Sequence, residues 1–146
     1  MAATFRKTRL RDLGNVLITP LARLGLAGKR MHVLTVPGRK SGSRYSTPVQ
    51  LVIQNGERWL VAPYGEREWV KNARAAGEVE LTRAGTTTRY AVEEIGPEKA
   101  APVLREYLRT TPVVKGYFDA TADAPLEAFA AEARRHPVFL LAAAAS

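Results

Sequence analysis

The side chains best suited to bind a charged ligand lie in one glycine-rich turn, residues 37–42, which reads Pro-Gly-Arg-Lys-Ser-Gly. Arg39 offers a forked donor, Lys40 a point charge and Ser41 a hydroxyl, and together these groups suit an oxyanion. Backbone N–H groups in a tight turn add further donors. The turn is not a P-loop, because the G-x-x-x-x-G-K-S/T spacing is missing and a strand is predicted to follow it. A basic hairpin tip exposed to water fits the same residues, so anion binding is one of two interpretations.

A second constellation comprises residues 62–65, which read Ala-Pro-Tyr-Gly, together with Trp69 and Asn72. A predicted strand ends here and a helix begins, and helix N-termini favour anions. Two glutamates already occupy the first turn of this helix, so a second anion would be repelled. We therefore expect Tyr64 and Gly65 to contact a planar ring or the edge of a phosphate. The alternative is purely structural, with Trp69 in the core and Asn72 a satisfied buried amide.

Several other kinds of chemistry are excluded by composition. The chain has no cysteine, which removes disulfides, zinc–thiolate sites, iron–sulfur clusters and thiol nucleophiles. His32 and His136 are the two histidines, too few for a histidine-rich metal site, so no metal is predicted. No G-x-S-x-G elbow is present, and the carboxylates are scattered. If the protein is an enzyme, a bound cofactor is expected to carry out the difficult step.

The positive charge is concentrated at one end of the chain. The formal net charge is +8, and residues 1–44 hold ten of the 22 lysines and arginines against one aspartate. This end is therefore predicted to face an anionic partner, for which a phosphorylated cofactor, membrane phosphates and nucleic acid all qualify. Nucleic acid ranks third, because aromatic residues scarcely interleave with the basic run and no binding motif is recognised.

Hydrophobic patterns predict five or six mostly antiparallel strands and a few short helices in residues 29–146. Asn55-Gly56 is a strong hairpin signal between the second and third strands, and these are expected to form a meander with the first. The arrangement predicts an α+β fold, a small β-barrel with helical decoration. The predicted strands span 30–36, 45–54, 57–62, 78–82, 86–95 and 138–141, and the helices span 66–76, a segment after 97, 113–118 and 126–135.

Residues 1–28 are predicted to form a separate basic helical segment, because leucines recur there every three or four residues. We expect a short helix pair that covers one end of the core. The alternative is a peripheral contact with a membrane surface. The chain has no run of about 18 apolar residues and no secretory signal, so a cytoplasmic location is expected.

Three blocks of sequence, in their order and spacing, carry a family resemblance. They are residues 34–42 followed by Pro48, residues 61–65, and residues 69–75. Over about residues 30–142 the chain resembles the deazaflavin-dependent nitroreductase family, a branch of the flavin and deazaflavin oxidoreductases with an FMN-binding-like split β-barrel. The resemblance implies a single split-barrel domain that binds coenzyme F-420, an 8-hydroxy-5-deazaflavin with an anionic phosphate and oligoglutamate tail. FMN is the alternative cofactor.

The resemblance also implies a role for individual positions. Arg39, Lys40 and Ser41 match the turn that binds phosphate. Tyr117 matches an aromatic residue that walls the substrate side in the nitroreductase branch. As our own hypothesis, Tyr64 and Tyr117 are the expected catalytic residues, either of which donates a hydrogen bond or proton to the product. The positions expected along the deazaflavin ring are Pro48, Gln50, Ala62, Pro63, Tyr64 and Gly65, and the cofactor-binding residues Trp69 and Asn72 match the helix that follows.

The chain also departs from the nitroreductase pattern. Pro63 replaces a serine, Tyr64 replaces a basic residue, and Thr111 and Val114 replace tyrosines on the substrate side. We therefore predict hydride transfer to a small electron acceptor such as a quinone or activated alkene instead of nitroimidazole reduction. The alternative is a non-catalytic module that sequesters a flavin, a deazaflavin or a lipid-like molecule. A homodimer is expected by analogy.

Overall fold

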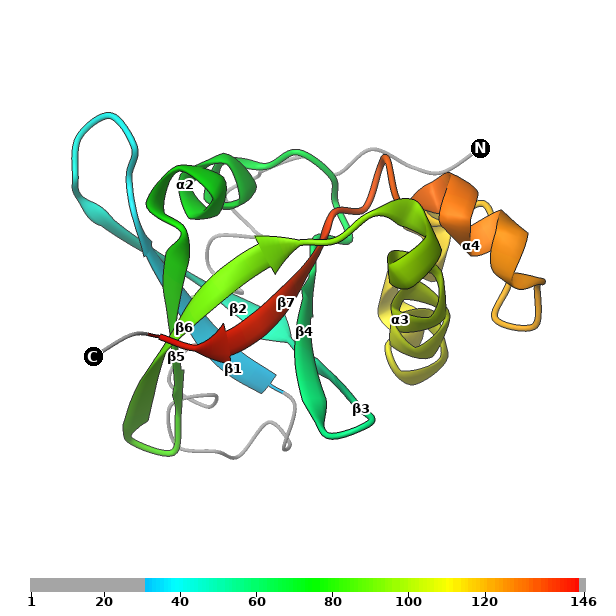
Figure 1. Ribbon diagram of the computed structural model, residues 1–146, viewed down its shortest axis with the longest axis horizontal. Helices are drawn as coiled ribbons and strands as arrows, with labels where there is room; N and C mark the ends of the chain where they lie inside the picture. Colours follow the sequence, from blue (N-terminus) through cyan, green and yellow to red (C-terminus); the bar gives the residue numbers. More distant parts are fainter. Residues whose placement is uncertain (1–30, 145–146) are drawn as a thin grey trace.

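A seven-stranded antiparallel sheet organises residues 31–144, the part of the chain that the computed structural model describes (Figure 1). The strands are β1 (Met31–Pro37), β2 (Arg44–Gln50), β3 (Val52–Gln54), β4 (Glu57–Val61), β5 (Glu78–Arg83), β6 (Thr86–Glu94) and β7 (Val138–Ala143). Their order across the sheet is β2-β1-β5-β6-β7-β4-β3, and each neighbouring pair is antiparallel.

Leu51 alone separates β2 from β3, yet these two strands form the opposite edges of the sheet. β2 pairs with β1, where Pro48 lies opposite Val33, and β3 pairs with β4, where Val52 lies opposite Trp59. Because one residue joins the two edges, the sheet has to curl back on itself. The side chain of Leu51 is fully buried. The result is a split barrel.

The predicted α+β split barrel is confirmed, with two corrections. The prediction of one continuous strand over 45–54 in a three-stranded meander is wrong, because β2 and β3 pair with partners at different ends of the sheet. This break also raises the number of strands above the predicted five or six. The terminal strand predicted at 138–141 is confirmed as β7, which lies between β6 and β4.

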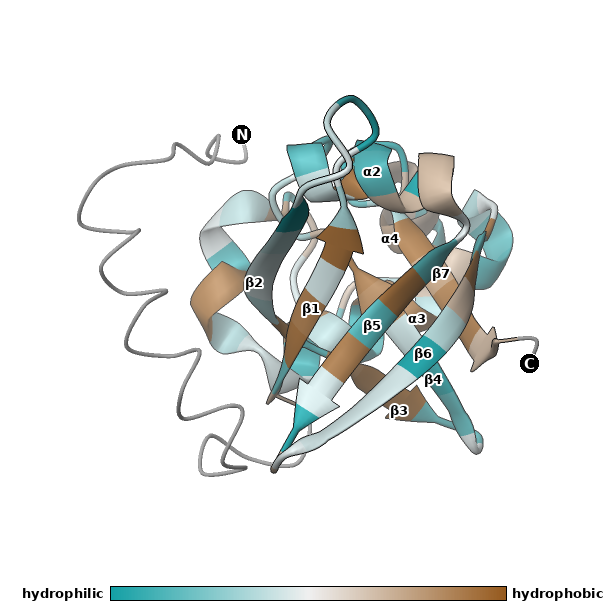
Figure 2. Ribbon diagram, turned by 90° about the vertical axis from the view of Figure 1, so that its left-hand side faces the viewer, coloured by the Kyte–Doolittle hydropathy of each residue, from teal (hydrophilic) through white to brown (hydrophobic). Residues whose placement is uncertain are grey.

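Successive residues along a strand point to opposite faces, and the sheet buries a hydrophobic cluster on each. Phe139 of β7 joins the cluster inside the barrel, together with Leu34, Leu60 and Leu81. Its neighbour Val138 joins the second cluster, which lies under the helices. The alternation is visible as brown bands separated by paler ones along β1 and β5 (Figure 2).

Four helical segments cover this sheet. α2 (Glu68–Ala76) contacts β1 and β5, whereas α3 (Pro97–Thr110), the 3-10 helix η1 (Pro112–Tyr117) and α4 (Leu126–Glu132) gather on the other side of the molecule (Figure 1). α2 ends at Gly77, as predicted, where a φ of 73° and an N–H bond to the Ala73 carbonyl close the helix.

Two helix boundaries differ from the predictions. α2 starts at Glu68 instead of residue 66, because residues 62–67 form a hydrogen-bonded turn and the Glu66 carboxylate pairs with Arg74. α4 ends at Glu132 instead of residue 135, and the chain then turns toward β7. No helix among residues 31–144 is long and apolar enough to cross a membrane. The basic segment predicted over residues 1–28 lies outside the described residues.

Candidate active site

The basic turn between β1 and β2 is tightly closed by its own backbone. Gly38 N–H donates to the Ser43 carbonyl at 2.7 Å, and Gly42 N–H donates to the Gly38 carbonyl at 2.9 Å. A Cβ on Gly38 would lie 2.7 Å from the exposed Tyr45 ring, so a larger residue at this position would force that side chain to move. The Ser41 hydroxyl accepts the Ser43 N–H at 3.2 Å. Its own O–H group can still donate to a ligand.

Asn72 of α2 holds this turn in place. Its Oδ1 atom accepts the backbone N–H of Arg39 at 3.1 Å and the Arg39 Nη1 group at 2.8 Å. Arg39 Nη1 also bonds to the Glu68 carboxylate at 2.7 Å, and this hydrogen bond lowers the pKa of Glu68. Asn72 is 4% exposed, so its carbonyl is a buried acceptor with two donors. The buried position expected in the structural alternative is observed for Asn72, with its carbonyl oxygen bonded twice, and its predicted role in coenzyme binding stays a prediction.

Arg39 and Lys40 consequently differ in what they offer a ligand. The Arg39 side chain is 24% exposed and commits one nitrogen to α2, which leaves its Nε and Nη2 groups without a hydrogen bond to any residue within 31–144. Lys40 is exposed and makes no ion pair within the same residues. Arg44 is paired with Glu80. Lys40 is therefore the cation of the turn that has no ion pair within residues 31–144, although its charge also acts on Glu68, and Arg39 acts largely as the anchor of the turn.

The predicted strand-end constellation, residues 62–65, leads from β4 directly into α2. Ala62 N–H donates to the Pro137 carbonyl at 2.9 Å, and Gly65 N–H donates to the Ala62 carbonyl at 3.3 Å. Gly65 has a φ of 84°, and a Cβ there would lie 3.2 Å from the Arg135 carbonyl oxygen. Both features require glycine. α2 thus joins the two predicted halves of the candidate site. The basic turn is hydrogen-bonded to Asn72 of α2, and the loop of residues 62–65 leads directly into the first turn of the same helix.

Tyr64 and Tyr117, the two residues expected to be catalytic, are in contact. Their ring centroids lie 4.8 Å apart at an interplanar angle of 75°, an edge-to-face arrangement. Both side chains are half-buried. Burial, with a smaller contribution from nearby Tyr64, raises the pKa of the adjacent Tyr107. The tyrosines come from the loop before α2 and from η1, so the fold brings together residues that are distant in sequence.

Gln50 and Trp69 have contacts that the sequence did not predict in full. The Gln50 Nε2 group donates to the Thr110 carbonyl at 3.2 Å and to the Thr111 hydroxyl at 3.0 Å, so it fixes the end of α3 and the start of η1. Trp69 packs against the core inside the barrel, with its ring 6.3 Å from that of Phe139. Pro48 is half-buried on β2. Trp69 is therefore a partly buried residue at the margin of the core, and its predicted contact with the coenzyme stays a prediction.

A buried polar cluster behind the tyrosine pair was missed by the sequence analysis. Glu132 and His136 are 2% and 3% exposed, and the His136 ring stacks on Phe118 with centroids 4.0 Å apart. The His136 Nε2 atom lies 3.7 Å from the Glu132 carboxylate, and the backbone of Pro63 and of Tyr117 lies close to the imidazole ring. The i, i+4 spacing of a glutamate and a histidine was the signal available in the sequence.

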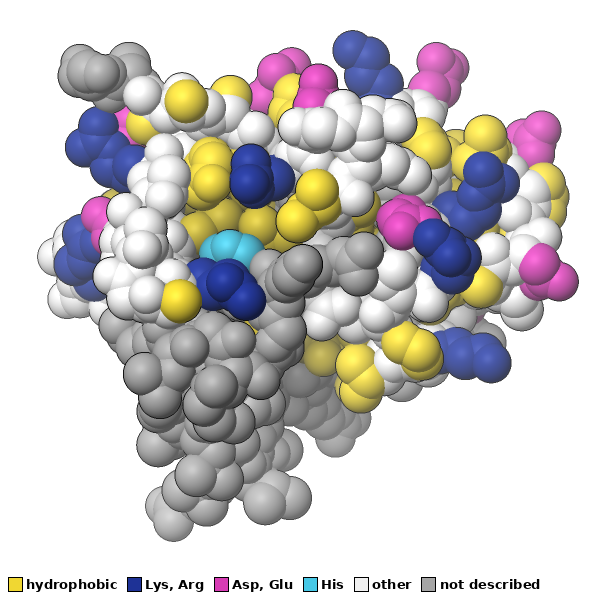
Figure 3. Space-filling view, turned by 90° about the horizontal axis from the view of Figure 1, so that it is seen from below, with side chains coloured by type: hydrophobic (Ala, Val, Ile, Leu, Met, Phe, Trp, Pro, Cys, Tyr) yellow, Lys and Arg dark blue, Asp and Glu magenta, His cyan; other side chains and the backbone are white. Residues whose placement is uncertain are grey.

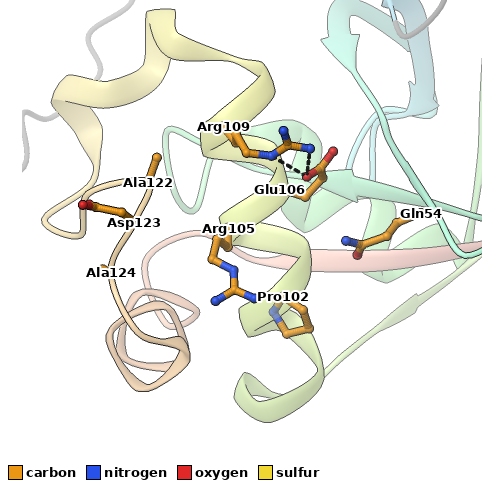
Figure 4. A pocket seen from close by; sticks show the side chains of 8 residues that line it. All are labelled: Gln54, Pro102, Arg105, Glu106, Arg109, Ala122, Asp123 and Ala124. Atoms are coloured by element: carbon orange, nitrogen blue, oxygen red, sulfur yellow. Dashed lines mark hydrogen bonds and ion pairs between the residues drawn. The ribbon is translucent and has the colours of Figure 1, made fainter.

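A pocket of about 400 Å³ on the outer side of α3 shares no residue with the predicted site (Figure 4). Its arginines, Arg105 and Arg109, are balanced by Glu106 and Asp123, and Arg109 is bonded to Glu106. Its charges therefore give no preference for an anionic coenzyme. On the face opposite α2, hydrophobic side chains line a hollow beside lysine and arginine side chains (Figure 3).

The curled antiparallel sheet places the protein in the class of split-barrel proteins. Residues 19–126 match the family model of the F420H(2)-dependent quinone reductases. The chain belongs to this family, so it is an oxidoreductase whose coenzyme is F-420. The resemblance to deazaflavin-dependent reductases is thereby confirmed. A search of curated proteins finds no match.

Solved structures with the same fold have low sequence identity to the chain. A structure described as an F420-H2 dependent reductase (FDR-A) is 19% identical, with a TM-score of 0.54 over 77% of this chain and 94% of that one. The conserved hypothetical protein Rv2991 from Mycobacterium tuberculosis is 15% identical, with a TM-score of 0.58 over 99% and 86%. A structure described as a domain-swapped dimer is 18% identical, with a TM-score of 0.57 over 90% and 96%.

Replacing Asn72 should loosen the basic turn. Asn72→Ala removes the acceptor of the partly buried N–H of Arg39 and of its Nη1 group, so we expect the free energy of unfolding to fall by about 1–2 kcal/mol. Urea denaturation measures this change, and hydrogen exchange at the Arg39 amide should accelerate. Lys71→Ala, at an exposed position of the same helix, is the matched control. Equal stability of the two variants would contradict the anchoring role.

His136 should make stability depend on pH. Burial lowers its pKa below the ordinary 6.5, although the Glu132 carboxylate acts in the opposite direction. Below pH 6.5 the unfolded chain therefore binds more protons than the folded one, and stability decreases as the pH falls through this value. Urea denaturation from pH 7.5 to 5.5 should show this decrease. His136→Phe keeps an aromatic ring against Phe118 and should flatten the profile, whereas parallel profiles would refute the assignment.

Proposed function

We propose that the protein transfers a hydride from reduced coenzyme F-420 to an electron-poor small molecule, such as a quinone or an activated alkene. One observation carries the proposal. α2 brings the cationic turn and the loop of residues 62–65 to the same part of the barrel, and that loop presents Tyr64 against Tyr117. The cationic turn and the pair of tyrosine rings are thereby both held next to α2.

The donor set of the turn suits the phosphate and glutamate tail of this coenzyme. Lys40 supplies a charge that has no ion pair among the described residues, Ser41 supplies an O–H donor, and Arg39 supplies the Nε and Nη2 groups of its guanidinium, which α2 does not use. A helix-anchored turn loses little conformational entropy when it binds an anion. These three residues would hold the charged end of the coenzyme.

The strand-end loop suits the flat ring. Gly65 lets the backbone approach closely, and Pro63 presents an apolar surface without an N–H group. Ala62 and Trp69 support this loop from the core, with Pro48 and Gln50 on β2 completing the proposed ring-binding set. When bound, the reduced deazaflavin supplies a hydride, which carries both electrons. The protein orients the ring and excludes water around it.

The tyrosine pair is proposed to complete the reaction. An acceptor that gains a hydride becomes an anion, and one proton then converts it to the neutral product. The hydroxyl of Tyr64 or Tyr117 is placed to donate that proton, which solvent afterwards replaces. Pro63, Thr111 and Val114 stand where the nitroreductases have hydroxyl-bearing residues, so a quinone or alkene is favoured over a nitroimidazole. The family name points to quinones as well.

Two further expectations concern partners. A homodimer is supported by the similar structure described as a domain-swapped dimer, a likeness in fold alone. The proposed membrane or nucleic-acid contact through the basic N-terminal segment depends on residues outside the described range. FMN is retained only as the alternative cofactor.

Lys40 should matter for the charged tail of the coenzyme and not for its ring. We expect Lys40→Ala to weaken binding of intact coenzyme F-420 about tenfold, because a charged hydrogen bond is lost. Binding of the phosphate-free deazaflavin fragment should stay unchanged. Fluorescence titration measures both, with Lys99→Ala on α3 as the control. Failure of the wild-type protein to bind micromolar coenzyme would end the proposal.

Turnover should depend on the tyrosine pair. With reduced coenzyme F-420 and menadione, we expect the wild-type protein to oxidise the coenzyme, which absorbance follows directly. Tyr117→Phe removes a proton donor and should lower kcat by about tenfold or more, with coenzyme affinity unchanged. Tyr90→Phe, at a half-buried position on β6, is the control. Tight binding without turnover for any acceptor would favour a sequestering module instead.

A further inference from the structure

Tyr64 and Tyr117 come from segments that are far apart in sequence. One short segment contacts the residues next to each of them. This bridging segment, residues 132–137, runs from the end of α4 to the start of β7. On one side, the Pro137 carbonyl accepts the Ala62 N–H at 2.9 Å, and the Arg135 carbonyl lies against Gly65. The bridging segment therefore supports the loop that carries Tyr64.

On its other side, the bridging segment holds the chain that follows Tyr117. One carboxylate oxygen of Glu132, Oε2, accepts the backbone N–H groups of Asp119 at 2.6 Å and Ala120 at 2.8 Å. The ring of His136 stacks on Phe118 with an interplanar angle of 12°. These contacts fix the residues immediately after Tyr117, and so the end of η1.

Glu132 is the central group of this connection. Its side chain is 2% exposed, and its second oxygen, Oε1, bonds to Arg135 Nη2 at 2.5 Å. A buried carboxylate is costly unless its oxygens are bonded, and charge-assisted bonds are stronger than neutral ones. Glu132 faces inward, and its carboxylate accepts hydrogen bonds from the backbone of Asp119 and Ala120. Its hydrogen bonds hold the chain after Tyr117 against the bridging segment.

We propose that Glu132 is a positioning residue for the reductase reaction, which sets the contact between Tyr117 and Tyr64 by holding residues 118–120 to the bridging segment. This inference rests on the proposed function, because it concerns the same tyrosines. Glu132 does not touch the reacting atoms. It acts through the backbone, so its loss should be felt by Tyr117 and not by the coenzyme-binding turn.

The first test is spectroscopic and needs no turnover. In Glu132→Gln a single amide oxygen replaces the carboxylate, so the two backbone N–H groups and Arg135 cannot all keep their acceptor, and the bonds that remain are neutral and weaker. Because edge-to-face rings shift each other's NMR signals, the ring signals of Tyr64 and Tyr117 should move. The signals of Tyr45 and Tyr90 should not. Glu127→Gln, exposed on the same helix, is the matched control.

The outcome of this test decides the positioning role whether or not the wild-type protein turns over. Unchanged Tyr64 and Tyr117 signals in a folded Glu132→Gln variant would overturn the inference, as would equal movement of all tyrosine signals. Arg135→Met removes one hydrogen-bond partner of Glu132. The Arg135 side chain is 45% exposed, so this substitution should destabilise the fold less than a change at the buried Glu132. It should shift the same two signals by a smaller amount, and unshifted signals there would equally oppose the inference.

The second test is a double-mutant cycle on menadione reduction. Glu132→Gln should lower kcat by about tenfold, since small misplacements of a reacting group are costly. In a Tyr117→Ala background the same substitution should lower kcat less than about twofold, because the group it positions is gone. Coenzyme affinity should be unchanged in both backgrounds. Equal losses of kcat in the two backgrounds would reduce Glu132 to a general stabilising residue.

Discussion

A single residue, Leu51, joins the two edges of the sheet, and the rest of the architecture depends on that link. β2 and β3 cannot separate by more than one residue's reach, so five intervening strands must curve between them. The curvature creates an interior that Leu51 and its neighbours fill. It also brings the end of β2 to the end of α3, where Gln50 bonds to Thr110 and Thr111. The site lies along the edge that this closure produces.

α2 connects the two loops of the candidate site, the basic turn between β1 and β2 and the loop of residues 62–65. Its buried Asn72 carbonyl takes two donors from Arg39, and its first turn grows out of the loop that contains Gly65. Arg39, which the sequence marks as a ligand-binding charge, is paired with Glu68, and the neighbouring Arg44 is paired with Glu80. The electrostatic attraction of the turn therefore rests on Lys40 and on the groups of Arg39 that α2 leaves unbonded. Much of the nominal charge is structural.

The aromatic side of the site has a different basis. Tyr64 and Tyr117 meet edge to face on the surface of a polar cluster that is almost wholly buried. In such surroundings a carboxylate with three hydrogen bonds is rigid, because each lost bond leaves a desolvated group. Rigidity behind the tyrosines and a fixed turn beside α2 suit a hydride transfer, in which donor and acceptor must be held at short range.

The sequence by itself determined the local features. Asn55-Gly56 forms the predicted hairpin, with φ angles of 55° and 77°, and Gly77 ends α2. Three spaced motifs were enough to indicate the family. Only the tertiary structure decided that residues 44–54 divide between the two edges of the sheet. It also decided that Gln50 bonds to the end of α3 and that Glu132 is buried. Turns and caps follow from the φ preferences of neighbouring residues, whereas these latter features depend on partners far along the chain, which periodicity does not encode.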